Sequence, residues 1–171
     1  MKTLYLLRHA KSSWDDDALA DRDRPLAARG QRAAQRMAIY IKRAGIRPAL
    51  VLCSSARRTR DTLDALIASL GEEVEVRIEE DLYGSAGAAL LGRLRRVGAR
   101  TPSVMLIGHN PGIQDLAIEL AGDGDDRALR QLRTKFPTGA LATLELDDVE
   151  WNELGSGLGY LDSVVLPAQL Q

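Results

Sequence analysis

Cysteine and histidine are scarce in this sequence. Its 171 residues include one cysteine, Cys53, and two histidines, His9 and His109. A single cysteine excludes an internal disulfide, and three such side chains are too few for a zinc cluster of the usual spacing. We therefore expect chemistry that needs neither a metal nor another cofactor.

Neither sign of charge predominates. Lys and Arg number 23, Asp and Glu number 24, and the formal net charge is -1. A balanced chain has no overall field that would hold nucleic acid or an anionic membrane surface. We expect no nucleic-acid partner and no membrane partner, so any recognition of phosphate has to be local.

Long hydrophobic runs are also missing. The run nearest the start, Leu4 to Leu7, is far shorter than the core of a signal peptide, and no stretch could span a bilayer. The sequence therefore predicts a cytoplasmic protein. Its length and its 45% hydrophobic content favour one domain over residues 1–171.

Strand and helix patterns alternate along the first two thirds of the chain. Four continuous apolar runs, typical of strands covered on both faces, are Thr3–Leu7, Ala49–Cys53, Val74–Ile78 and Ser103–Ile107. Each precedes a helical pattern that ends at a glycine, and these are Leu26–Ala44, Ser55–Leu70, Ala86–Val97 and Ile113–Ala121. The tail suggests a strand at Ala140–Leu146, a turn at Asp147-Asp148 and a hairpin-like extension through Glu150–Leu154 and Leu158–Val165. We predict a three-layer α/β/α sandwich with a mostly parallel central sheet and an antiparallel edge.

Both histidines follow predicted strands of this sheet. Ligands of such sheets bind where the carboxyl ends of the strands open onto the next loops. The polar residues at these ends are Arg8 and His9, then Ser54, Arg57 and Arg58, then His109 and Asn110. Because chance seldom puts both histidines of a chain at one rim, we predict a functional site there.

Arginines and a helix N-terminus could bind a phosphoryl group at this rim. The planar fork of arginine binds two phosphoryl oxygens through charge-assisted hydrogen bonds. We expect Arg8 and Arg58 in this role, although spacing alone does not separate Arg58 from Arg57. Asn110 could cap a helix that begins at Pro111 and directs free backbone N–H groups to the rim.

An imidazole beside such an anion site is a candidate nucleophile. We assign this role to His9, which attacks phosphorus while neutral and which neighbouring arginines keep unprotonated. His109, facing the phosphate dianion, is expected to be pushed toward the protonated form that donates a hydrogen bond. The surroundings would thus give two identical side chains two roles.

Three motifs stand at these strand ends: LLRHAKS, LCSSARRTRDT and LIGHNPG. They resemble those of the histidine phosphatase superfamily, the phosphoglycerate mutase-like group, and the resemblance spans residues 4 to 112. It includes a fourth piece, RPLAARG, and implies a phosphoglycerate mutase-like fold and a phosphatase with a phosphohistidine intermediate. The short chain without a large lid is most similar to the bacterial SixA-type phosphohistidine phosphatases.

The resemblance implies a role for individual residues. It makes His9 the phosphorylated nucleophile, Arg8 its phosphate-binding neighbour and His109 the second histidine, which contacts the phosphoryl group. Arg24 resembles an arginine that approaches the substrate in the short members, and an exposed loop arginine is the equal alternative.

The second motif decides between the two neighbouring arginines. In the family, a serine is followed four residues later by the phosphate-binding arginine and eight residues later by a threonine. Ser54, Arg58 and Thr62 match this pattern, which selects Arg58 over Arg57. One departure is Ala10, which stands where the first motif commonly has glycine.

The general acid is a second departure. Larger family members carry a carboxylate after the third strand, and Glu80 stands at a compatible distance, although a solvated loop carboxylate is the alternative. A P–N bond is labile once its nitrogen is protonated, so a phosphohistidine substrate depends less on such an acid. The segment before LIGH is too short for a lid, and an open site admits a phosphohistidine on a partner protein.

Other functions stay open at this point. A phosphatase or mutase for a small phosphate ester would need Glu80 as its acid. A cysteine phosphatase based on Cys53 would need arginine six positions later, where Thr59 stands. A phosphopeptide-binding module would hold phosphate without turnover. The acidic run Asp123–Asp126 lacks the spacing of an EF-hand loop, so we expect a turn there.

Overall fold

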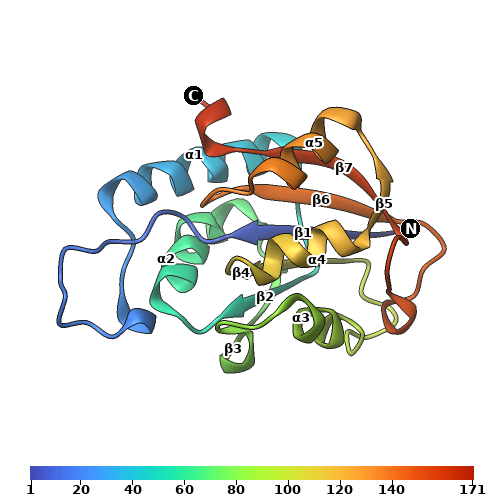
Figure 1. Ribbon diagram of the computed structural model, residues 1–171, viewed down its shortest axis with the longest axis horizontal. Coiled ribbons are helices and arrows are strands. Elements are labelled where there is room, and N and C mark those ends of the chain that lie inside the picture. Colours follow the sequence, from blue (N-terminus) through green and yellow to red (C-terminus); the bar gives the residue numbers. More distant parts are fainter.

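A seven-stranded sheet forms the centre of the computed structural model, which describes all 171 residues (Figure 1). The strand order is β3-β2-β4-β1-β6-β7-β5. The strands are β1 Lys2–Arg8, β2 Leu50–Ser54, β3 Glu75–Glu79, β4 Ser103–Gly108, β5 Ala121–Gly124, β6 Leu141–Leu146 and β7 Gly159–Val165. The four strands predicted for the first two thirds of the chain are all present, displaced by no more than one residue at either end.

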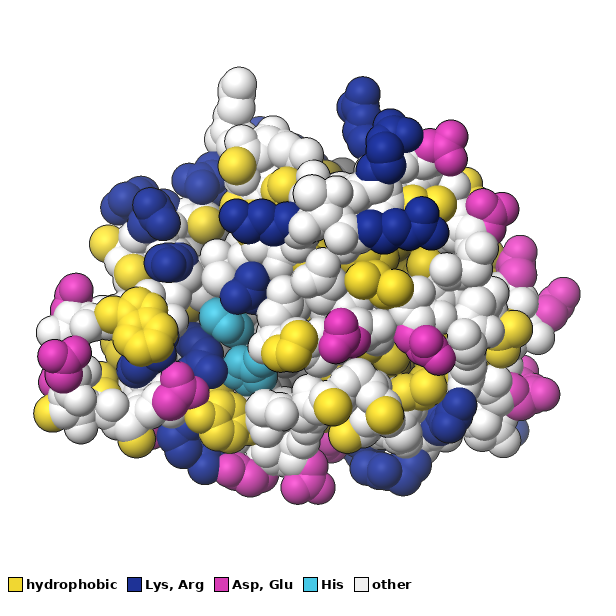
Figure 2. Space-filling model, viewed as in Figure 1, with side chains coloured by type: hydrophobic (Ala, Val, Ile, Leu, Met, Phe, Trp, Pro, Cys, Tyr) yellow, Lys and Arg dark blue, Asp and Glu magenta, His cyan; other side chains and the backbone are white.

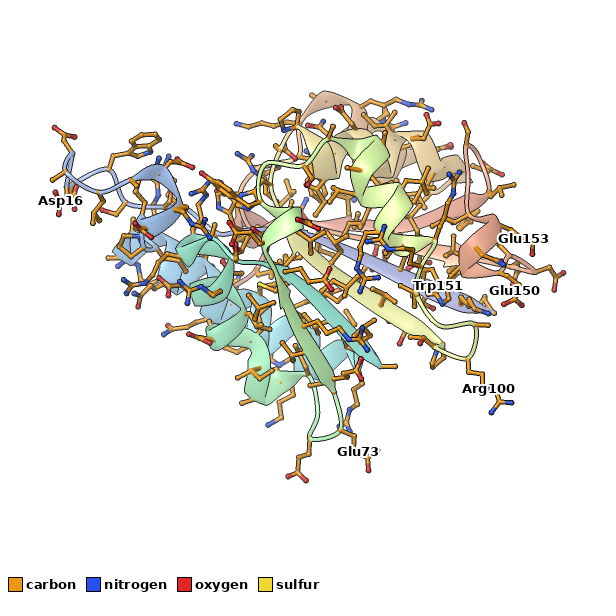
Figure 3. The ribbon with its side chains drawn as sticks, turned by 90° about the horizontal axis from the view of Figure 1, so that it is seen from below. Asp16, Glu73, Arg100, Glu150, Trp151 and Glu153 are labelled. Atoms are coloured by element: carbon orange, nitrogen blue, oxygen red, sulfur yellow. The ribbon has the colours of Figure 1, made fainter.

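Helices cover both faces of the sheet. They are α1 Ala28–Ala44, α2 Arg57–Leu66, α3 Gly87–Leu94, α4 Gly112–Leu120 and α5 Asp126–Thr134. Helices α1 and α2 pack on one face through a core that includes Met37 and Leu66. Helices α3, α4 and α5 pack on the other through a larger core that includes Leu90, Leu116 and Leu132. Figure 3 shows the strands between the two helix layers, which confirms the predicted three-layer sandwich.

Alternating side chains of the central strands supply both cores. In β1, Leu4 and Leu6 join the core beneath α3, α4 and α5, whereas Leu7 joins the core beneath α1 and α2. The neighbouring strand β4 divides Leu106 and Met105 in the same way. Strands apolar on both faces appear in the sequence as unbroken hydrophobic runs, which is why these two were easily predicted.

The sheet is mostly parallel, as predicted. Strands β3, β2, β4 and β1 are parallel to their neighbours. Only β6 runs against its neighbours, and it lies between β1 and β7 rather than at an edge. The edge strands are β3 and β5, and β5 is parallel to β7. The antiparallel strand is therefore present, but it is inside the sheet.

Edge strand β3 departs from the expectation of a strand covered on both faces. Residues 75–78 are exposed, including Val76 at 36% and Ile78 at 46%. The sequence here alternates apolar and charged residues, VEVRI, as is usual for a strand with one solvated face.

The segment Glu150–Leu154, expected as extended chain, contains a 3-10 turn over Trp151–Glu153. The ring of Trp151 is buried, and its Nε1 donates a hydrogen bond to the backbone oxygen of Thr101 at 2.7 Å. Burial of this ring gives the connection between β6 and β7 its irregular path. No helix of the structure combines the length and the hydrophobicity needed to cross a membrane.

The prediction of a turn at Asp123–Asp126 was wrong. These residues are the end of β5 and the start of α5. The side chain of Asp125 accepts a hydrogen bond from the backbone N–H of Ala128 at 2.9 Å, so it is the N-cap of a helix.

Candidate active site

The pairing of β1 with β4 brings the two histidines together. Arg8 is the register partner of Gly108, and the N–H of His9 donates to the oxygen of Gly108 at 3.1 Å. His9 and His109 therefore follow neighbouring strands at the same rim, and their ring centroids are 5.3 Å apart. The predicted convergence of the two imidazoles is present.

His9 is held as a neutral imidazole with one free nitrogen. Its Nδ1 lies 2.7 Å from the backbone oxygen of Ala10, so Nδ1 carries the proton and Nε2 keeps its lone pair. Burial lowers the pKa of His9 to about 3, and the charges of Arg58 and Arg8 act in the same direction. This is the protonation state that a nucleophile requires.

His109 occupies a similar environment but keeps a different nitrogen free. Its Nε2 lies 2.8 Å from Oγ of Ser54, and its Nδ1 is buried without a hydrogen-bond partner. The pKa of His109 is lowered to about 4, mainly by burial; the charge of Arg58 acts in the same direction, and Asp21 opposes it. A bound dianion would raise this pKa and favour the donor form.

Arg8 lies at the end of β1 beside His9. Its Nη1 donates to the oxygen of Phe136 at 3.0 Å, whereas its Nε is buried and unpartnered. In the whole chain, Arg8 Nε and His109 Nδ1 are the two buried side-chain nitrogen or oxygen atoms that lack a partner. Since buried polar groups are normally satisfied, two unpartnered nitrogens at one rim, one of them an arginine donor, are what an anion site would provide.

The structure separates the two candidate arginines of the second motif. Arg58 is 9% exposed, and its charge acts on both histidines. Arg57 is exposed and pairs with Asp61 at 3.3 Å on the outer surface of α2. Arg58 is thus the arginine at the rim, as the motif spacing implied.

Asp21 and Tyr83 complete the surroundings of Arg58, and the sequence did not identify either. Arg58 Nη1 donates to the backbone oxygen of Asp21 at 2.8 Å, and Nη2 donates to its Oδ2 at 3.0 Å. The hydroxyl of Tyr83 donates to the same Oδ2 at 2.5 Å, which lowers the pKa of Asp21. The Tyr83 ring meets His109 edge-on, with centroids 5.6 Å apart.

Thr62 ties the first motif to the second. Its Oγ1 accepts a hydrogen bond from the N–H of Ala10 at 3.0 Å and donates one to the oxygen of Arg58 at 2.7 Å. The backbone immediately after His9 is therefore fixed to the first turn of α2. This contact gives Thr62 a positioning role that its place in the motif did not reveal.

Arg24 is buried, at 6% exposure, and belongs to the loop between β1 and α1. Its Nε donates to the oxygen of Ser13 and its Nη1 to Oδ1 of Asp21, both at 3.0 Å. Its guanidinium also lies 3.2 Å from the ring centroid of Trp14. These contacts connect Arg24 to Arg58 through Asp21, and its direct approach to a substrate stays a prediction.

Glu80 lies near the site but is already paired. It forms an ion pair with Arg22 and accepts a hydrogen bond from Ser55 at 2.8 Å. The hydrogen bond from Arg22, reinforced by that from Ser55, lowers the pKa of Glu80 to about 2. A carboxylate held in its ionised form is poorly suited to protonating a leaving group.

Helix α4 begins at Gly112, one residue later than expected, and the side chain of Asn110 still accepts a hydrogen bond from its first turn. The N-cap of α4 is Pro111, and the Asn110–Pro111 peptide bond is cis. Asn110 Oδ1 accepts from the N–H of Gln114 at 3.3 Å, and the N–H of Ile113 donates to the oxygen of His109. These amides are therefore satisfied within the loop rather than directed at a ligand.

Cys53 is buried in the core beneath α1 and α2. Burial raises the pKa of its thiol to about 12, so the thiolate that a cysteine phosphatase needs does not form near neutral pH. No group of three or more His, Cys, Asp or Glu side chains is arranged to hold a metal ion.

Comparison with known families agrees with this arrangement. Residues 4–103 match the model of the histidine phosphatase superfamily, branch 1. The chain belongs to this superfamily. The matched segment contains His9 and the second motif, and His109 follows shortly after it.

Relatives of the superfamily extend the likeness over nearly the whole chain. An uncharacterised protein of Mycobacterium tuberculosis is 38% identical over 165 residues, 94% of this chain and 99% of the relative. SixA of Nakamurella multipartitia, to which phosphohistidine phosphatase activity is attributed, is 31% identical with a TM-score of 0.82, over 97% of this chain and 96% of that one. SixA of Agrobacterium tumefaciens, described in the same way, is 30% identical with a TM-score of 0.76, over 84% and 91%. The phosphoglycerate mutase-like fold and the SixA-type resemblance are confirmed.

Proposed function

We propose that this chain is a metal-independent phosphatase that works through a phosphohistidine intermediate on His9. The observation that carries the proposal is the pair of buried nitrogens without a hydrogen-bond partner, Arg8 Nε and His109 Nδ1, beside an imidazole whose Nε2 is free. Arg8 Nε is a donor, and His109 Nδ1 is one when Ser54 donates to Nε2 or when the ring is protonated. Such donors would bind phosphoryl oxygens and lose no other hydrogen bond in doing so. The similarity to SixA proteins supports the same chemistry.

The first step transfers the phosphoryl group to the protein. His9 Nε2 attacks phosphorus, the new N–P bond forms, and the bond from phosphorus to the leaving group breaks. Arg8, Arg58 and protonated His109 bind the phosphoryl oxygens as charge builds on them. The leaving nitrogen or oxygen takes a proton from His109 or from solvent.

The second step regenerates the enzyme. Water attacks phosphorus and passes one proton to His109, or to solvent if the first step drew its proton from there. The bond to His9 Nε2 breaks, and inorganic phosphate leaves while Nε2 recovers its lone pair. Because burial keeps the pKa of His9 at about 3, Nε2 is not trapped by a proton between turnovers.

The favoured substrate is phosphohistidine on a partner protein. Figure 2 shows both histidines at the surface of a hollow on one face, where they are 7% and 6% exposed. A shallow site of this kind can receive a side chain presented by another protein. The ionised Glu80 cannot protonate a leaving group. The labile P–N bond of phosphohistidine depends less on such a proton than the P–O bond of an ester does.

Labelling with phosphoramidate would test this function directly. We expect wild-type protein to take up acid-labile phosphate, and the His9→Ala variant to take up none. A phosphopeptide-binding module would bind phosphate but remain unlabelled, which would overturn the proposal. A panel of phosphohistidine peptides and small phosphate esters, assayed without added metal and with a chelator, would establish the substrate class.

A further inference from the structure

The outer face of α5 is strongly cationic. Arg127, Arg130 and Arg133 recur every three residues, and Lys135 follows at the end of the helix. All four are exposed, and none takes part in an ion pair. Positions three apart form one stripe along a helix, and the opposite side of α5 is buried through Ala128 and Leu132. We call these four residues the α5 cationic face.

The α5 cationic face leads directly to the candidate active site. The carbonyl oxygen of Phe136, the residue after Lys135, accepts hydrogen bonds from Arg8 Nη1 at 3.0 Å and from Asn110 Nδ2 at 3.1 Å. Gln114 Nε2 donates to the oxygen of Leu132 at 2.8 Å and fixes the end of α5 to α4. Figure 2 shows Lys and Arg side chains gathered over α5, next to the two histidines.

Helix stability does not account for this concentration of charge. A cation in the last turn, such as Arg133, stabilises the helix dipole, but Arg127 lies at the other end of α5, where a cation is unfavourable. Solubility would be served equally by mixed charges, and the whole chain has a net charge of only -1. Asp125 and Asp126 lie at the N-terminal end of α5, so the excess of positive charge is greatest toward its C-terminal end, at Arg130, Arg133 and Lys135. Such a local excess beside a site creates a field that steers and orients a charged partner.

We propose that the α5 cationic face docks an acidic segment of the protein that carries the substrate phosphohistidine. This inference rests on the proposed function, because it names the partner of the same site. The acidic run Asp15–Asp17 does not cancel the field, because its loop projects away from α5, with Asp16 at the tip (Figures 1 and 3). An acidic partner segment would bring its phosphoryl group onto Arg8 from the α5 side.

Binding to a catalytically inactive protein tests docking apart from turnover. The probes are three fluorescent peptides of equal length, each with one phosphohistidine flanked by Glu, Ser or Lys, bound to the His9→Ala variant. We expect the Glu peptide to bind about tenfold more tightly than the Ser peptide at low salt. At about 0.5 M salt, where charges are screened within a few ångström, this advantage should fall below about twofold.

Charge reversal on α5 tests whether the preference for the Glu peptide depends on the α5 cationic face. In the His9→Ala background, the double change Arg130→Glu and Arg133→Glu should abolish the preference for Glu. The matched control is Arg43→Glu with Arg100→Glu, which changes the net charge equally and also alters one cation in the last turn of a helix. Arg43 and Arg100 are exposed residues without ion pairs. They precede β2 and β4, and therefore lie toward the amino ends of these strands, away from the carboxyl ends that carry the site. Glutamine at 130 and 133 replaces glutamate if circular dichroism shows that the reversed variant is unfolded.

Several results would overturn the docking proposal. These are equal affinities for the three peptides, a preference for Lys, or equal losses in the reversed and control variants. Tighter binding of a short DNA oligonucleotide than of the Glu peptide would assign the face to a nucleic acid instead. The proposed function fails separately, if wild-type protein hydrolyses none of the peptides. In that case the binding comparison still decides whether the α5 cationic face docks acidic segments.

Discussion

Asp21 holds both terminal nitrogens of Arg58. One donates to the backbone oxygen of Asp21 at 2.8 Å and the other to its Oδ2 at 3.0 Å. Asp21 is itself fixed, because Arg24 donates to Oδ1 and Tyr83 donates to Oδ2. The orientation of the candidate phosphate-binding arginine is therefore set by a loop more than thirty residues earlier in the chain.

Replacing Asp21 by Asn tests this orientation. The variant keeps the backbone contact but loses the charge, so we expect kcat/KM for phosphohistidine peptides to fall about tenfold, mainly through KM. Asp23→Asn, an exposed neighbour whose side chain has no hydrogen bond, is the matched control. An increase in kcat/KM would contradict the positioning role and show instead that Asp21 competes with phosphate for Arg58.

The two histidines should make stability fall as the pH drops below neutrality. Their folded pKa values are about 3 and about 4, so the unfolded chain binds protons near pH 6.5 that the folded chain does not. Because the unfolded state binds more protons, the free energy of unfolding should decrease by roughly 2–4 kcal/mol between about pH 7 and about pH 5.

Urea unfolding over this pH range measures the decrease. No other side-chain type has an ordinary pKa in this interval, so a double variant with Gln at positions 9 and 109 should show a nearly flat dependence. A flat dependence in the wild type would mean that the histidines are not buried as described.

Glu80→Gln should leave hydrolysis of phosphohistidine within about threefold of wild type. The carboxylate is ionised and paired with Arg22, so it has no proton to donate at neutral pH. If Glu80 were the general acid, the loss would be about 10²–10⁴-fold. Steady-state assays on an ester and on a phosphohistidine peptide, run side by side, distinguish the two cases.

Thr62→Val should destabilise the protein by about 1–3 kcal/mol, because it leaves the buried N–H of Ala10 without an acceptor. Thr134→Val is the control: its hydroxyl makes the same contact to the oxygen four residues earlier, but on the exposed surface of α5. There we expect a change within about 0.5 kcal/mol. Equal effects in thermal unfolding would show that the link between the two motifs is unimportant.

Gly30→Ala should destabilise the protein by about 1–3 kcal/mol. A Cβ at this position would lie 2.0 Å from the backbone oxygen of Lys11, so α1 and the loop after His9 would have to separate. Gly92→Ala in α3 meets no atom within 4 Å and should instead stabilise by up to about 1 kcal/mol. Denaturant unfolding measures both effects. If the unfolding midpoints of the two variants shifted in the same direction, the close approach of Gly30 to Lys11 would be contradicted.

The sequence predicted those parts of the fold whose signal is local. Strands β1, β2 and β4 are apolar on both faces, and α1 ends at Gly45 as predicted. Helices α2 and α3 end at Leu66 and Leu94, before the predicted ends at Leu70 and Val97. Strand order carries no such signal, which is why β6 was expected at an edge. Helix α5 was missed because its apolar face is reduced to Ala128, Leu129 and Leu132 among charged residues, although the capping Asp125 was a usable sign.

The residues of the candidate site were likewise predicted only where the signal is local in the sequence. His9, Arg8, Arg58 and His109 were identified because they follow strands or match motif spacing, and the structure brings them to one rim. Asp21 and Tyr83 act on Arg58 across large sequence separations, and no pattern in one sequence pairs them. An aspartate three residues before Arg24 was the only local hint.

The interior position of β6 determines when the sheet around His9 can fold during synthesis. Strand β1, which ends beside His9, has β4 and β6 as its two neighbours, and both are synthesised about a hundred residues or more after it. At roughly 5–20 residues per second, a ribosome needs several seconds to supply them. During that time the nascent chain carries its future nucleophile without a folded pocket, and the two-sided pairing of β1 that positions His9 forms only after β6 has been synthesised.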